Sequence, residues 1–280
     1  MTSRQCRALI LSAAVALRPA AAAAALVLIS VPEEITMGRQ AQAAMAARTP
    51  RIASAEIQGY VSQIGRRLAA SAGGPAFSYS FDVANLAEVN ALTLPGGHVW
   101  VYRGALSIAR SESELAGVLA HEVAHVAERH AARQASTAMV AGIGLELLSA
   151  LLGNTGGAVT SGMAASALTG SVFLGFSRED ELVADREGTR ILRKAGWDPG
   201  GLASFLEAAR ATARKNPTAL DVFFSTHPAT DDRIAALRRT SASHGSLRRD
   251  SAAFAAMKKR LSALPPPPKP STAGATSRHM

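Results

Sequence analysis

The sequence predicts a mainly α-helical protein of the α+β class, in which a small β-sheet lies beside one central helix. Alanine-rich stretches carry apolar residues at helical spacing through most of the 280 residues. Only two short segments show the alternation that is typical of strands. Hydrophobic residues make up 48% of the chain and charged residues 18%, which is enough for one packed core. We therefore expect a single domain over residues 32–262.

Residues 1–31 are predicted to be a targeting segment. Arg4 and Arg7 precede an apolar run that is followed by small residues, as in a secretory signal peptide. Arg18 interrupts the apolar stretch and disfavours a membrane span, and an uncleaved N-terminal anchor is the alternative. The single cysteine, Cys6, lies before this run, so the mature domain would contain no disulfide bond. These features fit export to a bacterial periplasm, with or without an anchor in the inner membrane.

Two helices and two strands are predicted before the central helix. Residues 33–71 read as two helices separated near Pro50, and the Gly-Gly-Pro turn at 73–75 ends the second one. Residues 77–83 alternate as FSYSFDV and predict a strand. Residues 98–102, HVWVY, predict another strand. Because both strands closely precede the central helix, we expect them to form a sheet beside it.

The segment between the two strands suggests how a peptide could bind. It runs from Asn90 to Gly97 and ends in a Pro-Gly-Gly turn. An edge strand of the predicted sheet could hold an extended peptide by main-chain hydrogen bonds. The candidate substrate-binding residues are therefore Asn90, Gly97, His98 and Val99. A purely structural hairpin explains the same pattern equally well.

The central helix is predicted over residues 115–130, LAGVLAHEVAHVAERH. Ser111 and Glu114 form a capping-box pattern at its start. Apolar residues recur at helical spacing along it, so one face should be buried. Buried helices are common, but this one also carries polar residues, which are candidates for a functional site.

An HExxH motif lies in this helix. His121 and His125 are four residues apart and should project from the same side. Two imidazoles held in this way can bind one zinc ion, and Glu122 beside them can reach a water molecule at the metal. A core helix that carries two histidines by chance is the alternative.

Residues 135–176 contain two apolar pieces around a glycine-rich stretch. Each piece is short for a membrane span, and Glu146 interrupts the first. A helical hairpin packed over the site, or a lid on glycine hinges, fits the pattern. Ordinary core is the alternative, and a hairpin that dips into a membrane is disfavoured.

A second polar motif, SREDELVADREG, begins at Ser177 and predicts the start of another helix. A catalytic zinc site needs a third protein ligand, for which Glu181 is a candidate. Asp185 lies one turn later on the same face and could bind the second ring nitrogen of a zinc-bound histidine. Glu179 and Asp180 are nearby, so an ordinary acidic helix start also explains the motif.

Together these motifs resemble the gluzincin peptidases that include the CAAX prenyl endopeptidases and the HtpX-type heat-shock proteases. That family has HExxH, then SRxxExEAD, then a histidine-proline pair. This chain carries the motifs as His121–His125, Ser177–Asp185 and His227-Pro228. Its NALTLPGGHVWVYRGAL segment is also similar, whereas Val183 replaces the second glutamate of ExEAD. The resemblance covers about residues 33–237, and the exported, periplasmic bacterial branch is the more similar one because the several membrane spans of the prenyl endopeptidases are absent.

This resemblance implies a zincin-like helical fold with Zn²⁺ at the HExxH helix. It assigns as metal ligands His121, His125 and Glu181. Glu122 would be the general base, taking a proton from water and passing it to the leaving amine. His227 would lie near the zinc, where it could contact the reacting oxyanion or fill the open coordination position.

The expected activity is that of a zinc-dependent endopeptidase. Its substrates would be misfolded or unassembled envelope polypeptides, and its partners a membrane surface or the envelope assembly machinery. Asp185 and Arg233 are expected to support the ligands from behind. A chaperone-like quality-control factor with a latched, rarely active zinc site is the alternative function.

The C-terminal part is predicted to be two further helices and a tail. One helix should begin at residues 197–199 with Asp198 as its cap, and another should contain Asp231. Residues 263–280 are proline-rich and expected to be disordered. The net charge is +9, and much of the excess lies between residues 233 and 260. These charges are not interleaved with a series of stacking aromatic residues, so a solvated helix face or an anionic membrane surface is favoured over nucleic acid.

Overall fold

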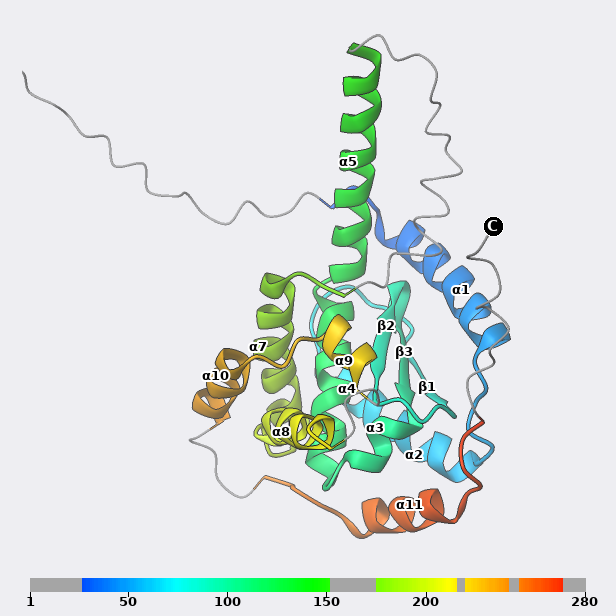
Figure 1. Ribbon diagram of the computed structural model, residues 1–280, viewed down its shortest axis with the longest axis vertical. Helices are drawn as coiled ribbons and strands as arrows, with labels where there is room; N and C mark the ends of the chain where they lie inside the picture. Colours follow the sequence, from blue (N-terminus) through cyan, green and yellow to red (C-terminus); the bar gives the residue numbers. More distant parts are fainter. Residues whose placement is uncertain (1–26, 152–174, 216–219, 242–246, 269–280) are drawn as a thin grey trace, which may run out of the picture.

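Helix α4 (Glu112–Ala127) lies at the centre of the fold, and every one of its residues is buried. In the computed structural model, helices α2 (Ala55–Ala69), α7 (Arg178–Lys194) and α8 (Gly201–Ala213) pack around it, with the sheet on another side (Figure 1). The structure describes residues 27–151, 175–215, 220–241 and 247–268. The mainly helical α+β class predicted from the sequence is confirmed.

The small sheet has three strands in the order β1-β3-β2. The strands are β1 (Ser80–Ala84), β2 (Ala91–Leu94) and β3 (His98–Tyr102). β1 pairs with β3 in parallel, and β2 pairs with β3 antiparallel across the short 3₁₀ turn at Pro95–Gly97. The central strand, β3, is the predicted one. β1 begins later than predicted, because its partner β3 begins at His98, which lies opposite Ser80. The strand β2 was not predicted.

Serine side chains cap the starts of five helices in the described part of the chain. They accept hydrogen bonds from backbone amides in the first turns, as is typical of N-caps. The five caps are Ser30 of α1 (Val31–Arg48), Ser54 of α2, Ser111 of α4, Ser177 of α7 and Ser251 of α11 (Ala252–Ala263). The box predicted for α4 is only half formed, because the Glu114 carboxylate binds Arg110 instead. The central helix therefore begins after Ser111, as the sequence predicts, but it ends at Ala127 and not at His130, because Arg129 leaves the helical conformation.

The predicted start of α8 is wrong. Asp198 does not cap the helix, because the helix begins three residues later, at Gly201. The Asp198 carboxylate instead accepts a hydrogen bond from the amide of Gly200 at 2.9 Å and holds the turn that precedes the helix. Local sequence indicated a polar turn correctly but not where the helix begins after it.

Glycines bring α7 and α8 into backbone contact with α4. A Cβ atom on Gly117 would lie 2.5 Å from the amide nitrogen of Leu202, and one on Gly201 would lie 2.0 Å from the carbonyl oxygen of Ser113. On α7, a Cβ atom at Gly188 would lie 3.1 Å from the Cα atom of His121. These contacts let the two helices approach α4 more closely than side chains would allow.

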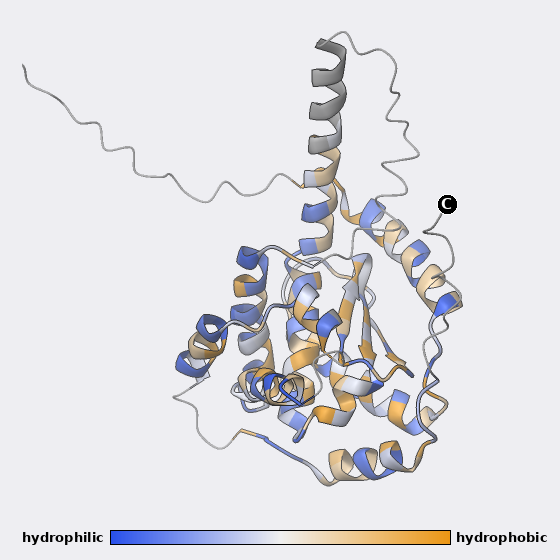
Figure 2. Ribbon diagram, in the orientation of Figure 1, coloured by the Kyte–Doolittle hydropathy of each residue, from blue (hydrophilic) through white to orange (hydrophobic). Residues whose placement is uncertain are grey.

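Helix α5 (His130–Leu151) extends away from the rest of the fold (Figure 1). α5 includes the first apolar piece of the hairpin predicted at residues 135–176. Residues 152–174 of that hairpin lie outside the described part of the chain. Within the described residues, no helix combines the length and the apolar character that crossing a membrane requires. Figure 2 shows hydrophobic stretches on the central ribbons of the body, whereas hydrophilic residues predominate on α7 and α10.

Four shorter helices complete the body. They are α3 (Arg103–Ile108), α9 (Asp221–Thr226), α10 (Asp231–Ser241) and α11 (Ala252–Ala263). The helix predicted around Asp231 is thus present. The Arg103 guanidinium donates to the carbonyls of Leu261, Leu264 and Pro265, so the first residues of the predicted proline-rich tail contact the body.

Two of the basic residues expected on a solvated face have other partners. Lys258 donates to the backbone carbonyls of Leu106, Ser107 and Ala109 at the end of α3. Arg233 is only 3% exposed. The excess positive charge is therefore partly structural.

Substitution of two helix glycines should distinguish tight packing from helix propensity. Gly117→Ala should lower the free energy of unfolding by about 1–3 kcal/mol, because the new methyl group overlaps the backbone of α8. Gly59→Ala in α2 is the matched control, since nothing lies within 4 Å of its Cβ position. It should raise the free energy of unfolding by about 0.5–1 kcal/mol. Urea denaturation measures both, and equal effects would contradict the packing argument.

Candidate metal centre

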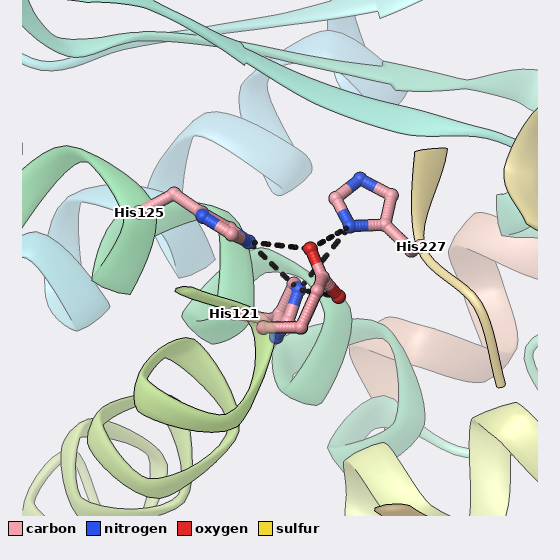
Figure 3. Close-up of side chains that lie close together, drawn as sticks. His121, His125 and His227 are labelled. Carbon is pink, nitrogen blue, oxygen red and sulfur yellow. Dashed lines mark hydrogen bonds and ion pairs between the residues drawn. The ribbon is translucent and has the colours of Figure 1, made fainter. Parts of the chain in front are cut away.

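Four buried side chains from three helices converge at the C-terminal half of α4. His121 and His125 come from α4, Glu181 from the first turn of α7, and His227 from the end of α9 (Figure 3). One donor atom from each residue lies within 4.8 Å of the donor atoms of the other three. The two HExxH histidines thus project from one side of their helix, as predicted.

The spacing of the donor atoms fits a zinc ion. Donors on a tetrahedral zinc with bonds of about 2.0–2.1 Å lie about 3.3–3.4 Å from each other. Nε2 of His125 lies 3.0 Å from Nε2 of His121 and 3.3 Å from Oε1 of Glu181. Nδ1 of His227 lies 3.0 Å from the same Glu181 oxygen and 3.4 Å from Nε2 of His121. Two or three imidazoles with one carboxylate form a donor set that zinc prefers.

One face of α7 supplies the carboxylates. Glu181, Asp185 and Gly188 recur at helical spacing and all are buried. Gly188 permits the close approach to α4, and that approach brings Glu181 among the histidines. The neighbouring Glu179 is exposed, and Asp180 binds the Ser177 cap of the helix. The ambiguity among the three acidic residues is therefore resolved by burial.

Behind the ligands lies a network of buried charges. Oδ1 of Asp185 lies 3.2 Å from Nδ1 of His121, the ring nitrogen that faces away from the cluster. Arg233 binds both oxygens of Asp185, each at 2.7 Å, and its Nη1 lies 2.7 Å from Oε2 of Glu181. Paired charges and charge-assisted hydrogen bonds offset the cost of burying these groups. Asp185 thus lies behind His121, and Arg233 lies behind Asp185 and Glu181.

The protonation of the cluster follows from these contacts. Burial opposes charge on His121, but the Glu181 and Asp185 carboxylates outweigh it and raise the pKa of this histidine to about 10. Burial lowers the pKa of His125 well below its ordinary value. The pKa of Glu181 is low although burial opposes it, because His121 and the other histidines stabilise the carboxylate. A metal cation that binds here would therefore replace the proton on His121.

Glu122 lies beside the cluster with one free carboxylate oxygen. The residue is 1% exposed, and Oε2 has no hydrogen-bond partner among the described residues. Oε1 lies 3.6 Å from Nε2 of His227. Thr93 of β2 donates to the backbone carbonyl of Glu122 at 3.0 Å and so fixes the sheet to the helix at this point. An unpaired buried acceptor is costly unless water or a ligand completes it.

Of the four candidate substrate-binding residues, only Asn90 adjoins the edge strand beside the cluster. His98 and Val99 belong to β3, whose backbone is paired on both sides, and a Cβ atom on Gly97 would contact Phe77 at 3.1 Å. Asn90 is buried and directly precedes β2. β2 is an edge strand, because it pairs with β3 alone in the described sheet. It is the edge next to the cluster, because its Thr93 donates to the backbone carbonyl of Glu122.

Two neighbours of His125 were not anticipated from the sequence. Nδ1 of His130 lies 2.7 Å from Nδ1 of His125, and the Phe176 ring stacks on His125 with centroids 4.1 Å apart. Residues five apart lie on different faces of a continuous helix, so the spacing of the two histidines gave no signal. The contact between His130 and His125 is possible only because α4 ends before His130.

Comparisons with known proteins agree with this geometry. Residues 55–241 match the sequence family described as Peptidase family M48, and the resemblance inferred from the motifs is confirmed. The chain is 32% identical over 220 residues to the beta-barrel assembly-enhancing protease of Yersinia pestis. The matched region is 75% of this chain and 44% of that protein. It is 33% identical over 175 residues to the mitochondrial metalloendopeptidase OMA1 of Schizosaccharomyces pombe, 62% of this chain and 50% of the relative. The chain thus spans half or less of the length of these relatives.

Substitutions around the cluster should separate ligands from supporting residues. Each of His121→Ala, His125→Ala and Glu181→Ala should abolish stoichiometric zinc binding, because each removes one donor atom. Asp185→Ala should weaken zinc binding by about 10- to 100-fold, because the ligand is retained but its orientation is lost. Metal analysis and competition with a chelator measure the two effects. Full zinc content in Glu181→Ala would rule out this residue as a ligand.

Proposed function

Since the chain belongs to peptidase family M48, we propose that it is a zinc-dependent endopeptidase. The observation that carries this proposal is the spacing of the His121, His125 and Glu181 donor atoms, which suits one tetrahedral zinc ion. A buried carboxylate, Glu122, lies beside them with an unpaired oxygen. This combination is what hydrolysis of a peptide bond requires: a metal site and a base within one closed space.

Each residue of the site has a defined part in the proposed reaction. Zinc, when bound, would polarise the scissile carbonyl and lower the pKa of water to about 7. Glu122 would accept a proton from the attacking water at its free oxygen and then pass that proton to the leaving amine. Asp185 and Arg233 would keep His121 and Glu181 oriented throughout.

A polypeptide substrate would be held along β2. This strand is the edge next to the cluster, and an extended peptide can add to such an edge by main-chain hydrogen bonds. Binding in this mode requires an extended chain, so unfolded or unassembled polypeptides are the substrate class that the site favours. Asn90 would help from the start of the strand, whereas His98 and Val99 would act only by supporting it.

The proposed setting is the bacterial envelope. The N-terminal segment reads as a signal peptide or anchor, and the Yersinia pestis relative is named for enhancing beta-barrel assembly. We therefore propose export to the periplasm and action on envelope proteins, in contact with the assembly machinery or a membrane surface. Quality control of misassembled proteins follows naturally from a preference for extended chains.

One observation favours a latched state of the same site. A pocket of only about 30 Å³ lies beside His227, lined also by Leu92 and Thr93 of β2 and by Phe176. Such a space holds about one water molecule, so a peptide cannot enter without movement of a neighbouring group. Nδ1 of His227 lies among the ligand atoms and could serve as a fourth ligand. A chaperone-like factor whose site rarely cuts would be the extreme form of this arrangement.

Glu122→Gln should keep zinc but lose cleavage of an unfolded polypeptide. The substitution removes only the proton acceptor and leaves the ligand residues in place. Zinc content and the rate of appearance of new amino termini are the measurements. Glu128→Gln, at the exposed end of the same helix, is the control and should cut at the wild-type rate. Wild-type cleavage by Glu122→Gln would show that another group is the base.

The role of His227 can be read from the sign of one rate change. If the histidine is a latch, His227→Ala should retain zinc and cleave an unfolded polypeptide faster, and this is the result that we expect. If it stabilises the oxyanion, the rate should instead fall by about 10²- to 10³-fold. The double variant with Glu122→Gln should show no cleavage, which excludes a contaminating protease. A clear fall in rate with zinc retained would overturn the latch.

A further inference from the structure

His130 is a fully buried histidine that the proposed reaction does not use. It is the first residue of α5, and its Nδ1 atom lies 2.7 Å from Nδ1 of His125. The two rings meet nearly edge to face, with an interplanar angle of 74°. Nε2 of His125 points the other way, into the ligand cluster. The contact is thus made to the back of a residue that has its other nitrogen at the metal site.

The backbone is bent at some cost to make this contact. Arg129 has a φ of 56°, and it is the one non-glycine residue with positive φ in the part of the chain that the structure describes. This left-handed conformation is unfavourable for residues with a side chain. It ends α4 and turns the chain so that His130 returns to His125. Arg129 is held there by the buried Glu34 carboxylate at 2.8 Å and by the carbonyl of Ile29.

The direction of the hydrogen bond between the two rings depends on the metal. A neutral imidazole has one donor nitrogen and one acceptor nitrogen. If Nε2 of His125 gives its lone pair to a metal, Nδ1 of His125 must carry the hydrogen and donate it. Nδ1 of His130 must then accept, and the hydrogen of His130 must be on Nε2. If the Nδ1 atoms of both histidines carried hydrogens, the two hydrogens would point at each other across a gap of 2.7 Å.

We propose that His130 is a positioning residue of the metal site, which orients His125 and selects the tautomer that presents Nε2 to zinc. The inference rests on the proposed function, because it takes His125 as a ligand. Partners of this kind commonly fix both the ring orientation and the tautomer of a metal-binding histidine. His121 has a carboxylate, Asp185, in the equivalent position, so each HExxH histidine has its own support.

His130 also lies close to the second ligand-bearing helix, α7. Its Nε2 atom faces Oδ1 of Asp180 at 3.5 Å, and the other oxygen of Asp180 binds the Ser177 cap of α7. Asp180 directly precedes Glu181 in the chain. His130 is thus hydrogen-bonded to His125 and lies close to the first turn of α7, although its Nε2 atom makes no hydrogen bond to the described residues.

The test compares two substitutions that differ in one acceptor atom. His130→Phe keeps an aromatic ring but removes the acceptor, whereas His130→Asn places its carbonyl oxygen close to the position of Nδ1. Zinc affinity of the full chain, measured by competition with a chelator, should fall by about 10- to 100-fold in His130→Phe. His130→Asn should recover most of this loss. Ser136→Ala, on the same helix as His130, is the control. It removes the hydrogen bonds of the Ser136 hydroxyl to the Leu28 amide and the Ala132 carbonyl but does not alter the cluster. The zinc affinity of this variant should be unchanged.

A spectroscopic measurement on the wild-type protein makes the test independent of how the variants fold. In zinc-loaded protein with ¹⁵N-labelled histidine, His125 should carry its proton on Nδ1 and His130 on Nε2. A proton on Nδ1 of His130 overturns the inference. So does wild-type zinc affinity in His130→Phe, or an equal loss in the Phe and Asn variants, which would indicate packing alone. Wild-type protein that binds no zinc would instead overturn the proposed function itself.

Discussion

The close approach of α7 to α4 is the constraint on which the site depends. A Cβ atom on Gly188 of α7 would lie 3.1 Å from the Cα atom of His121, so a side chain at this position would require the two helices to shift apart by a few tenths of an ångström. Separation would withdraw Glu181 from the histidines and Asp185 from the back of His121. The same small-residue packing holds α8 against the start of α4 at Gly117. Packing density therefore sets the metal geometry, because ligand distances of about 2 Å tolerate little displacement.

Electrostatics explains why such a site can be buried at all. Glu181 and Asp185 are buried carboxylates, and an isolated buried charge is strongly unfavourable. Arg233 compensates both, and it comes from α10, after the histidine that completes the cluster. The charged network is thus assembled from α4, α7 and α10 only when the domain is folded. The donor cluster is therefore formed only in the folded domain.

Rigidity on one side of the site contrasts with closure on the other. His121 and His125 are backed by Asp185 and His130, so their free nitrogens are held toward the cluster. On the opposite side, His227 leaves space for about one water molecule. A cluster that is firm on one side and has little space on the other agrees with the proposed preference for extended chains.

The sequence by itself determined what depends on neighbours within a few residues. Ser111 and Ser177 predicted where α4 and α7 begin, and the spacing of HExxH predicted two histidines on one face, because caps and helical periodicity are local. Only the tertiary structure decided which acidic residue of α7 faces the histidines, that β2 forms the edge strand, and that His130 meets His125. Each of these depends on contacts between distant segments or on a single backbone turn. Such contacts follow from how the helices pack, and no local pattern of residues encodes them.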